Sequence, residues 1–233
     1  MVTRCRGNGA SPSNIYQTIF NILSRHYPFL GRWKFWWYTL RRSMSPKAIA
    51  LLSNPHPCGH IVYPYTDEAL IAQAVTLYAT AGIKNGEGVI LVATPAHLQA
   101  IDHRLASYEN LDTNALQASG RLMYSDADDM LPRFMVNSIP DEKRFKDIFR
   151  QAIETTQAAV TKNEQPGLVR AFGEMVSLVL ADSVQAAELL ESYWDDLIKE
   201  YSISLLCSYT MTGAQPLAHS LADCHGHNLA HLN

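Results

Sequence analysis

The chain has 233 residues, of which 47% are hydrophobic and 18% charged, and its formal net charge is −3. This length suffices for one sizeable core, and the sequence has neither a long uncharged apolar run nor an N-terminal apolar segment with a cleavage site, which argues against a membrane span and a signal peptide. The four cysteines are far apart and form no CxxC pair, which argues against a disulfide framework or a zinc ribbon. We therefore expect a soluble cytoplasmic protein.

The charges divide the sequence into two regions. Eight Lys and Arg residues but no Asp or Glu precede Asp67, whereas the other 11 of the 19 basic residues and all 22 acidic residues follow. The basic region contains LGRWKFWWYTLRRS, a composition that suits an anionic membrane or a nucleic acid. The absence of acidic residues favours instead an extension without a stable fold, or upstream sequence translated before Met44. We assign residues 1–55 to this extension and a Pro-punctuated linker, and residues 56–233 to one folded domain.

Five short apolar segments in the second region are bounded by turn residues, as is typical of buried parallel strands. They are HIVYPY, GVILVAT, RLMYS, GLVRAFG and ISLLCSYTM. Helical patterns alternate with them, which predicts an α/β fold in three layers, with a mostly parallel central sheet and helices on both faces. No internal repeat is visible.

Residue types at the ends of these patterns mark the expected helices. We expect Thr66 to cap the helix after the first strand and Gly82 to Gly86 to end it, Thr94 with Pro95 to begin the next, and Asp141 to begin a long one. A further helix is expected from about residue 182 to 201, with its inward face formed by Val184, Ala187, Leu190, Trp194, Leu197 and Ile198.

In open α/β sheets, ligands bind beyond the carboxyl ends of the strands. That rule selects Tyr63, Tyr65, Thr94, His97, Ser125, Asp126, Phe172, Glu174, Tyr209 and Met211. The set is aromatic and lacks the loop glycines and the lysine that cradle a triphosphate, so nucleotide hydrolysis is disfavoured. Glu174 has Arg170 four positions earlier, and either a structural pair or a ligand-contacting carboxylate fits this pattern.

Two Cys/His tracts raise the question of a metal. HPCGH contains His56, Cys58 and His60, while Cys224, His227 and His231 are spaced to share one helical face. Neither spacing matches a zinc finger, and Cys224 continues an apolar stripe, which favours a core thiol. We expect no metal and no cofactor, with Cys224, His227 and His231 as the weaker alternative. No GxSxG motif supports serine catalysis.

Seven segments of the second region resemble, in the same order along the chain, segments of the MEDS sensory family. The family is named after methanogens, methylotrophs and the dichloromethane regulator. The segments are GHIVYPYTDEAL, AGIKNGEGVILVATPAHLQAI, ASGRLMYSDADDMLPRFM, PDEKRFKDIF, VRAFGEMVSLVLAD, AAELLESYWDDLIKEYSISLLCSYTM and CHGH. The similarity covers about residues 59–231. It implies a degenerate KaiC/RecA-like fold with its first strand central, in which YTDEAL stands in place of the phosphate loop.

The resemblance also implies a function. Members of the family are thought to sense small hydrocarbon derivatives, and recurrent motifs match His60, Tyr65, Arg170, Phe172, Glu174, Cys224 and His227. We expect a non-enzymatic sensory domain that binds a small organic ligand. The candidate ligand-binding residues are His60, Tyr63, Tyr65, His97, Arg170, Phe172, Glu174 and Tyr209.

No segment resembles a kinase or a helix-turn-helix, so we expect the signal to pass to a partner, either a histidine kinase or a transcriptional regulator. The rival hypothesis is a KaiC-like nucleotide-binding protein or an enzyme with an altered site, which uses Glu174. Contact of the basic N-terminal region with nucleic acid or membrane is a third, weaker interpretation.

Overall fold

The structure is a computed structural model that describes residues 44–162, 166–211 and 227–228. Residues 1–43 of the predicted N-terminal extension and linker, which spans residues 1–55, lie outside these residues. The helices are α3 (Pro46–Ser53), α4 (Glu68–Asn85), α5 (Pro95–Ser107), α6 (Thr113–Ala118), α7 (Ala127–Phe134), α8 (Glu142–Val160), α9 (Met175–Leu180) and α10 (Val184–Tyr201). The strands are β1 (His60–Tyr65), β2 (Gly88–Ala93), β3 (Leu122–Asp126), β4 (Met135–Val136), β5 (Ile139–Pro140), β6 (Val169–Gly173), β7 (Ser204–Thr210) and β8 (His227–Asn228).

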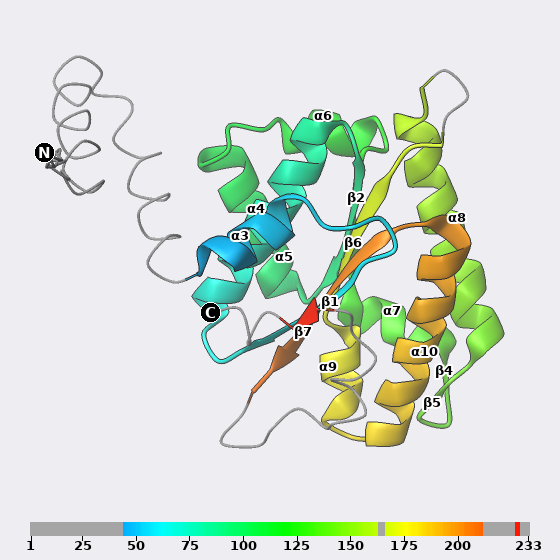
Figure 1. Cartoon of the computed structure of the whole chain (residues 1–233). Coiled ribbons are helices and arrows are strands. Elements are labelled where there is room, and N and C mark those ends of the chain that lie inside the picture. Colours follow the sequence, from blue (N-terminus) through cyan, green and yellow to red (C-terminus); the bar gives the residue numbers. More distant parts are fainter. Residues whose placement is uncertain (1–43, 163–165, 212–226, 229–233) are drawn as a thin grey trace, which may run out of the picture. The chain divides into compact units, whose positions relative to one another are not determined.

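The main sheet of the described residues has six strands in the order β3-β2-β6-β7-β1-β8. Every neighbouring pair in it is parallel, while β4 and β5 form a separate antiparallel pair. Helices α4 and α5 cover one face of the sheet, with α3 packed on α4, and α7 to α10 cover the other face (Figure 1). The predicted three-layer α/β fold is confirmed. The expectation of a central first strand is wrong: β6 and β7 lie at the centre of the sheet, and β1 lies between β7 and the two-residue strand β8.

Helices cover both faces of the sheet, so the strands need apolar side chains on both faces. All residues of β2 and β6 are buried. Parallel strands cannot be joined by tight turns, so the chain crosses over the sheet through helices between successive strands. This connectivity places the carboxyl ends of β1, β2, β6 and β7 along one edge.

Helix α4 is buried around its whole circumference over much of its length. Every residue from Ile71 to Thr80 is buried, because the sheet lies on one side and α3 and α5 pack on the others. The helix ends as predicted at Gly86, whose φ of 82° is left-handed. The predicted cap at Thr66 is wrong: Asp67 is the N-cap, and its carboxylate accepts a hydrogen bond of 2.8 Å from the amide of Ala69.

Residues 46–53 form helix α3, where the sequence predicts part of a linker. Ser45 caps the helix through a hydrogen bond of 3.1 Å from the amide of Ala48, and Pro46 occupies the first turn, where its missing N–H costs nothing. Ala48 and Leu52 are buried against α4. Residues 46–53 therefore form a helix that packs on α4.

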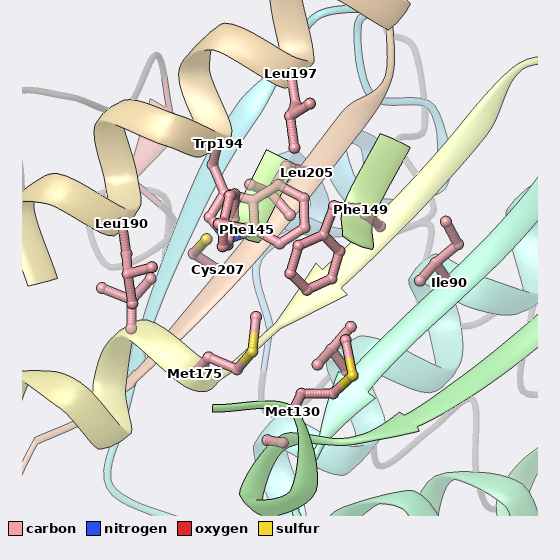
Figure 2. Packing of buried hydrophobic residues seen from close by; sticks show 14 of the residues in the cluster. Ile90, Met130, Phe145, Phe149, Met175, Leu190, Trp194, Leu197, Leu205 and Cys207 are labelled. Carbon is pink, nitrogen blue, oxygen red and sulfur yellow. The ribbon is translucent and has the colours of Figure 1, made fainter. Parts of the chain in front are cut away.

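The core on the other face is rich in aromatic side chains. The rings of Phe145 and Phe149 on α8 approach that of Trp194 on α10, with centroids 5.2 and 4.6 Å apart. Figure 2 shows Leu190, Trp194 and Leu197 pointing from α10 toward the sheet. The predicted inward face of α10 is confirmed except at Val184, the first residue of the helix, which is 40% exposed.

The other two predicted helix starts, at Asp141 and Thr94, are confirmed, and they differ only in how the cap is made. Asp141 caps α8 through a hydrogen bond of 2.9 Å from the amide of Arg144. Thr94 is the N-cap of α5, as predicted, but its side chain makes no capping hydrogen bond. Among the described residues, no helix combines the length and the apolar character needed to cross a bilayer.

Candidate functional site

Residues from five segments of the chain meet at the carboxyl edge of the sheet and form what we call the strand-end network. Its members are Tyr65, Glu68, Thr94, His97, Glu174 and Thr210. They are contributed by β1, the first turn of α4, the start of α5, the residue after β6, and the end of β7. Three of the predicted candidates, Tyr65, His97 and Glu174, are thus brought together by the fold.

Glu174 is the buried centre of the network. It directly follows β6, and its amide donates to the carbonyl of Val92 at 3.2 Å, which fixes the backbone against the neighbouring strand β2. One carboxylate oxygen accepts a hydrogen bond from the amide of Thr94, and the other lies 2.5 Å from Nδ1 of His97. A carboxylate that is only 3% exposed is tolerated here because both oxygens have donors.

His97 joins two carboxylates that come from different parts of the chain. Its Nδ1 contacts Glu174 and its Nε2 contacts Glu68 on the first turn of α4. The hydrogen bond to Glu174 raises the pKa of His97 to about 9, with the charge of Glu174 and the contact with Glu68 adding to it and partial burial opposing it. The imidazole is therefore protonated at neutral pH and bridges α4 to the end of β6.

Tyr65 supplies the aromatic wall of the network. Its ring lies edge-on to the imidazole of His97, with the centroids 6.2 Å apart, and its hydroxyl accepts a hydrogen bond of 2.9 Å from Thr210. Burial raises the pKa of Tyr65 to about 12, and the hydrogen bond from Thr210 opposes this shift. Tyr65 is thus a neutral phenol that ties β1 to β7.

Two further candidates are buried on the same face of the sheet. Tyr63 precedes Tyr65 by two residues on β1, and Phe172 precedes Glu174 by two along the chain; they are 3% and 1% exposed. Burial, followed by the charge of Asp67, raises the pKa of Tyr63. Both are core side chains on the face that α4 covers, and they contribute apolar surface.

Arg170 lies near the start of β6 and away from the strand-end network. Its guanidinium, on a side chain that is 1% exposed, donates to the carbonyls of Leu52 at 3.0 Å, Ser53 at 3.2 Å and Tyr78 at 3.3 Å, and pairs with Glu87. These contacts tie the end of α3 to α4 and β6. The carboxylate that pairs with Arg170 is Glu87 and not Glu174.

His60 and Tyr209 lie on the opposite face, in what we call the α10 cluster: His60, Glu191, Asp195, Cys207 and Tyr209. Strand residues alternate between faces, and Val62, two residues after His60, packs in the core under α10. Nδ1 of His60 lies 2.8 Å from Asp195, and its Nε2 lies 3.2 Å from Glu191 and 3.4 Å from Cys207. The hydroxyl of Tyr209 donates to the other oxygen of Glu191.

Burial and charge act in opposition on the α10 cluster. Burial raises the pKa of the Cys207 thiol to about 12, and the charge of Glu191 adds to the shift. Burial opposes protonation of His60, but Cys207 and the carboxylates of Asp195 and Glu191 raise its pKa well above the ordinary value. Because the thiol is itself neutral, the two carboxylates sustain that shift.

The predicted Cys/His tracts are not assembled as metal sites by the described residues. Cys224 and His231 lie outside those residues, and only the backbone of His227 is described, in β8 beside Ile61. In HPCGH, His56 and Cys58 are exposed whereas His60 is buried. The group of possible metal ligands that the described residues do bring together is His60, Glu191 and Cys207.

Sequence reasoning missed several members of both groups. Glu68 and Thr210 stand next to selected strand ends, so their position could have indicated them. Glu191 falls between Ala187 and Trp194 on the inward stripe of α10, and a carboxylate in an apolar stripe was a readable signal. The pairing of His60 with Cys207 depends on the register of β1 and β7, which a single sequence does not reveal.

Comparison with known proteins identifies the family of the chain. A search of curated proteins finds no match. The family model described as the methanogen/methylotroph, DcmR sensory domain (MEDS) matches residues 59–225, which is more than half of the chain and includes the strand-end network and the α10 cluster. The chain therefore belongs to the MEDS family of sensory domains.

Proposed function

We propose that this sensory domain binds a small organic ligand, of the hydrocarbon-derived class, at the strand-end network. The observation that carries the proposal is the position of His97 between Glu68 and Glu174, beside the ring of Tyr65. The side chain of Glu68 is 67% exposed, so the network begins at the surface and continues to a buried carboxylate. A ligand can thus reach the outer contact first.

The chemistry of the network suits a small, weakly polar molecule. Tyr65 offers an aromatic edge, and the imidazolium of His97 offers a charged donor once Glu68 moves aside. Aromatic surface holds an apolar part by burial, while a few polar groups orient the rest. Because a ligand shifts a conformational equilibrium only if it prefers one state, we expect the ligand to favour the state in which Glu68 and His97 are separated.

The rival function, binding or hydrolysis of a nucleotide, has less support. Asp67 caps α4 and Glu68 occupies its first turn, so carboxylates stand at the helix N-terminus where a phosphate would bind. Both oxygens of Glu174 are engaged, one by Thr94 and the other by the protonated His97. A carboxylate held in this way is a poor general base.

Signalling then passes to a partner, a histidine kinase or a transcriptional regulator. His97 links the first turn of α4 to the residue after β6, so its release would change how α4 is held against the sheet. Packed elements with two arrangements are the usual carriers of such a change. We propose that the partner senses this change in α4.

The test is a thermal-shift screen of small organic compounds against the full chain, because a ligand that binds the native state raises the apparent stability. Hits are then measured with His97→Gln, and with His103→Gln as the matched control, since His103 is an exposed histidine on the same helix. We expect binding to fall at least about tenfold in His97→Gln and to persist in His103→Gln.

Two results would count against the proposal. One is a hit whose affinity is the same in both histidine variants, which would place the ligand elsewhere. The other is saturable binding of ATP and magnesium with hydrolysis that Glu174→Gln abolishes, which would support the rival function.

A further inference from the structure

We propose that the α10 cluster is a binding site for one divalent ion of the zinc class, held by Nε2 of His60, a carboxylate oxygen of Glu191 and Sγ of Cys207. The three side chains come from β1, α10 and β7, and all three are buried. The site lies on the opposite face of the sheet from the strand-end network. It is thus a second site, independent of the ligand proposed above.

The distances between the three ligand atoms fit tetrahedral coordination. Bond lengths typical of zinc to nitrogen, oxygen and sulfur give tetrahedral edges of about 3.4 to 3.6 Å. In this protein the nitrogen lies 3.2 Å from the oxygen and 3.4 Å from the sulfur, and the sulfur lies 4.0 Å from the oxygen. Small side-chain movements of a few tenths of an ångström would place all three around one ion.

The surrounding groups orient the ligands as they do in known metal sites. The carboxylate of Asp195 accepts a hydrogen bond of 2.8 Å from Nδ1 of His60. This leaves Nε2 to face Glu191 and Cys207. The hydroxyl of Tyr209 donates to one oxygen of Glu191 and so directs the other oxygen toward Cys207 and His60. A carboxylate behind a ligating histidine is the usual arrangement that fixes the ring.

The donor set selects the class of ion. A thiolate, an imidazole and one carboxylate suit zinc or its spectroscopic substitute cobalt, whereas magnesium and calcium prefer oxygen ligands alone. An ion would take the place of the protons that otherwise lie between these atoms. Three protein ligands leave a fourth tetrahedral position for water or a small molecule, as in open zinc sites.

The contact between Cys207 and Glu191 is the one in the cluster that direct hydrogen bonding explains least well. The separation of 4.0 Å between the sulfur of Cys207 and Glu191 is too long for a hydrogen bond of useful strength. Glu191 is 0% exposed, and an ion would add a positive charge to the contacts that its carboxylate already makes with Tyr209 and with Nε2 of His60, 3.2 Å away.

The test uses the full chain. Purified protein is dialysed against metal-free buffer and its zinc content measured, and the chelator-treated protein is then titrated with cobalt. We expect one zinc per chain, and for the cobalt form a sulfur-to-cobalt charge-transfer band in the near ultraviolet together with the intense visible bands of a tetrahedral site. A folded wild-type chain that binds neither ion would overturn the proposal.

Variants assign the ion to the cluster. Cys207→Ser is expected to lose the charge-transfer band, while Cys58→Ser, which changes an exposed cysteine, keeps it. Asp195 is 29% exposed, so Asp195→Asn should fold, keep the band and weaken cobalt binding by about 10- to 100-fold. If Cys207→Ser does not fold, the weakened cobalt binding of Asp195→Asn still tests the proposal. A band that survives in Cys207→Ser, or one that Cys224→Ser removes, places the ion elsewhere and refutes the proposal.

Discussion

Nδ1 of His97 lies 2.5 Å from Oε2 of Glu174, although 77 positions separate the two residues in the chain. The contact joins the first turn of α5 to the residue that follows β6, across the edge where β2 and β6 end side by side. Because one partner is a protonated imidazole and the other a buried carboxylate, the contact is both a structural link and a group that titrates.

The first prediction concerns pH. The folded pKa of His97 is raised to about 9 by Glu174 and Glu68, so its stabilising effect is complete below the unfolded value of about 6.5 and is lost as pH rises through 9. The full shift corresponds to about 3 kcal/mol, and screening at the exposed Glu68 reduces the expected effect to about 1–2 kcal/mol. Urea unfolding of the wild type between pH 6 and 10 measures this loss.

The matched variants identify the titrating group. In His97→Gln the part of the pH dependence that falls between 6.5 and 9 should disappear, whereas in His103→Gln it should remain. An unchanged profile in His97→Gln would show that another group titrates.

The second prediction concerns Glu174. Glu174→Gln preserves the volume of the side chain but removes the charge that pairs with His97, so we expect a loss of about 1–3 kcal/mol in the free energy of unfolding at pH 7. Glu142→Gln is the control, because Glu142 is 57% exposed and its pair with Lys146 lies at the surface. That variant should change stability by less than about 1 kcal/mol.

A double-mutant cycle sharpens this result. If Glu174 and His97 act through their mutual contact, the effects of Glu174→Gln and His97→Gln should be non-additive by about 0.5–3 kcal/mol. Additive effects would mean that the contact contributes little.

The third prediction compares two arginines. Arg170 is buried and holds three backbone carbonyls and Glu87, whereas Arg150 makes a two-pronged contact with Glu200 at the surface. Lysine cannot reproduce the forked geometry. Arg170→Lys should therefore lower the free energy of unfolding by about 3–5 kcal/mol, and Arg150→Lys by less than about 1 kcal/mol.

Hydrogen exchange tests the cause of the Arg170 effect. Because Arg170 holds the carbonyls of Leu52 and Ser53, the amides of α3 should exchange faster in Arg170→Lys, including at denaturant concentrations where the sheet stays protected. Equal acceleration throughout the protein would contradict a local role in docking α3.

The fourth prediction concerns Gly82, in the last turns of α4. Replacing a helical glycine by alanine normally stabilises a protein by about 1 kcal/mol. Here a Cβ at residue 82 would lie 2.8 and 2.9 Å from the Cδ and Nε atoms of Arg170, which its hydrogen bonds hold in place. Gly82→Ala should therefore be destabilising by about 1–3 kcal/mol.

Gly173→Ala provides the comparison in thermal or urea unfolding. A Cβ at Gly173 meets no atom within 4 Å, so the substitution should be neutral or slightly stabilising. Stabilisation by Gly82→Ala would show that Arg170 moves aside at little cost.

The sequence allowed the layers and the edge of the candidate site to be predicted, because both follow from local patterns. Short apolar segments identified the five strands, and the rule on strand ends selected Tyr65, His97 and Glu174. The rule could not show that Tyr65 and Tyr209 lie on opposite faces of the sheet. Neighbouring residues of a strand point to opposite faces, so a shift of one residue in register changes the face. Arg170 became a candidate through the family resemblance and its four-residue spacing from Glu174, but its side chain lies near the start of β6, whereas Glu174 follows the end of that strand.

Other differences arise from contacts between distant segments. Helix α3 depends on burial of Ala48 and Leu52 against α4, and the short sequence between Ser45 and Asn54 has turn residues at both ends that resemble a linker. The N-cap of α4 is Asp67, one residue after the predicted Thr66. Helix propensity alone does not distinguish these two positions, because both residue types cap helices well.

The burial of α4 has a mechanical consequence. Its 18 residues span about 27 Å, from Glu68 at the strand-end network to the turn where Arg170 binds the carbonyl of Tyr78 and lies against Gly82. A helix packed on every side over its middle turns cannot bend locally to absorb a push at one end, so it behaves as a rod. We expect a displacement at Glu68 to be transmitted along this rod to the docking of α3, and to become measurable there before it is measurable in the sheet.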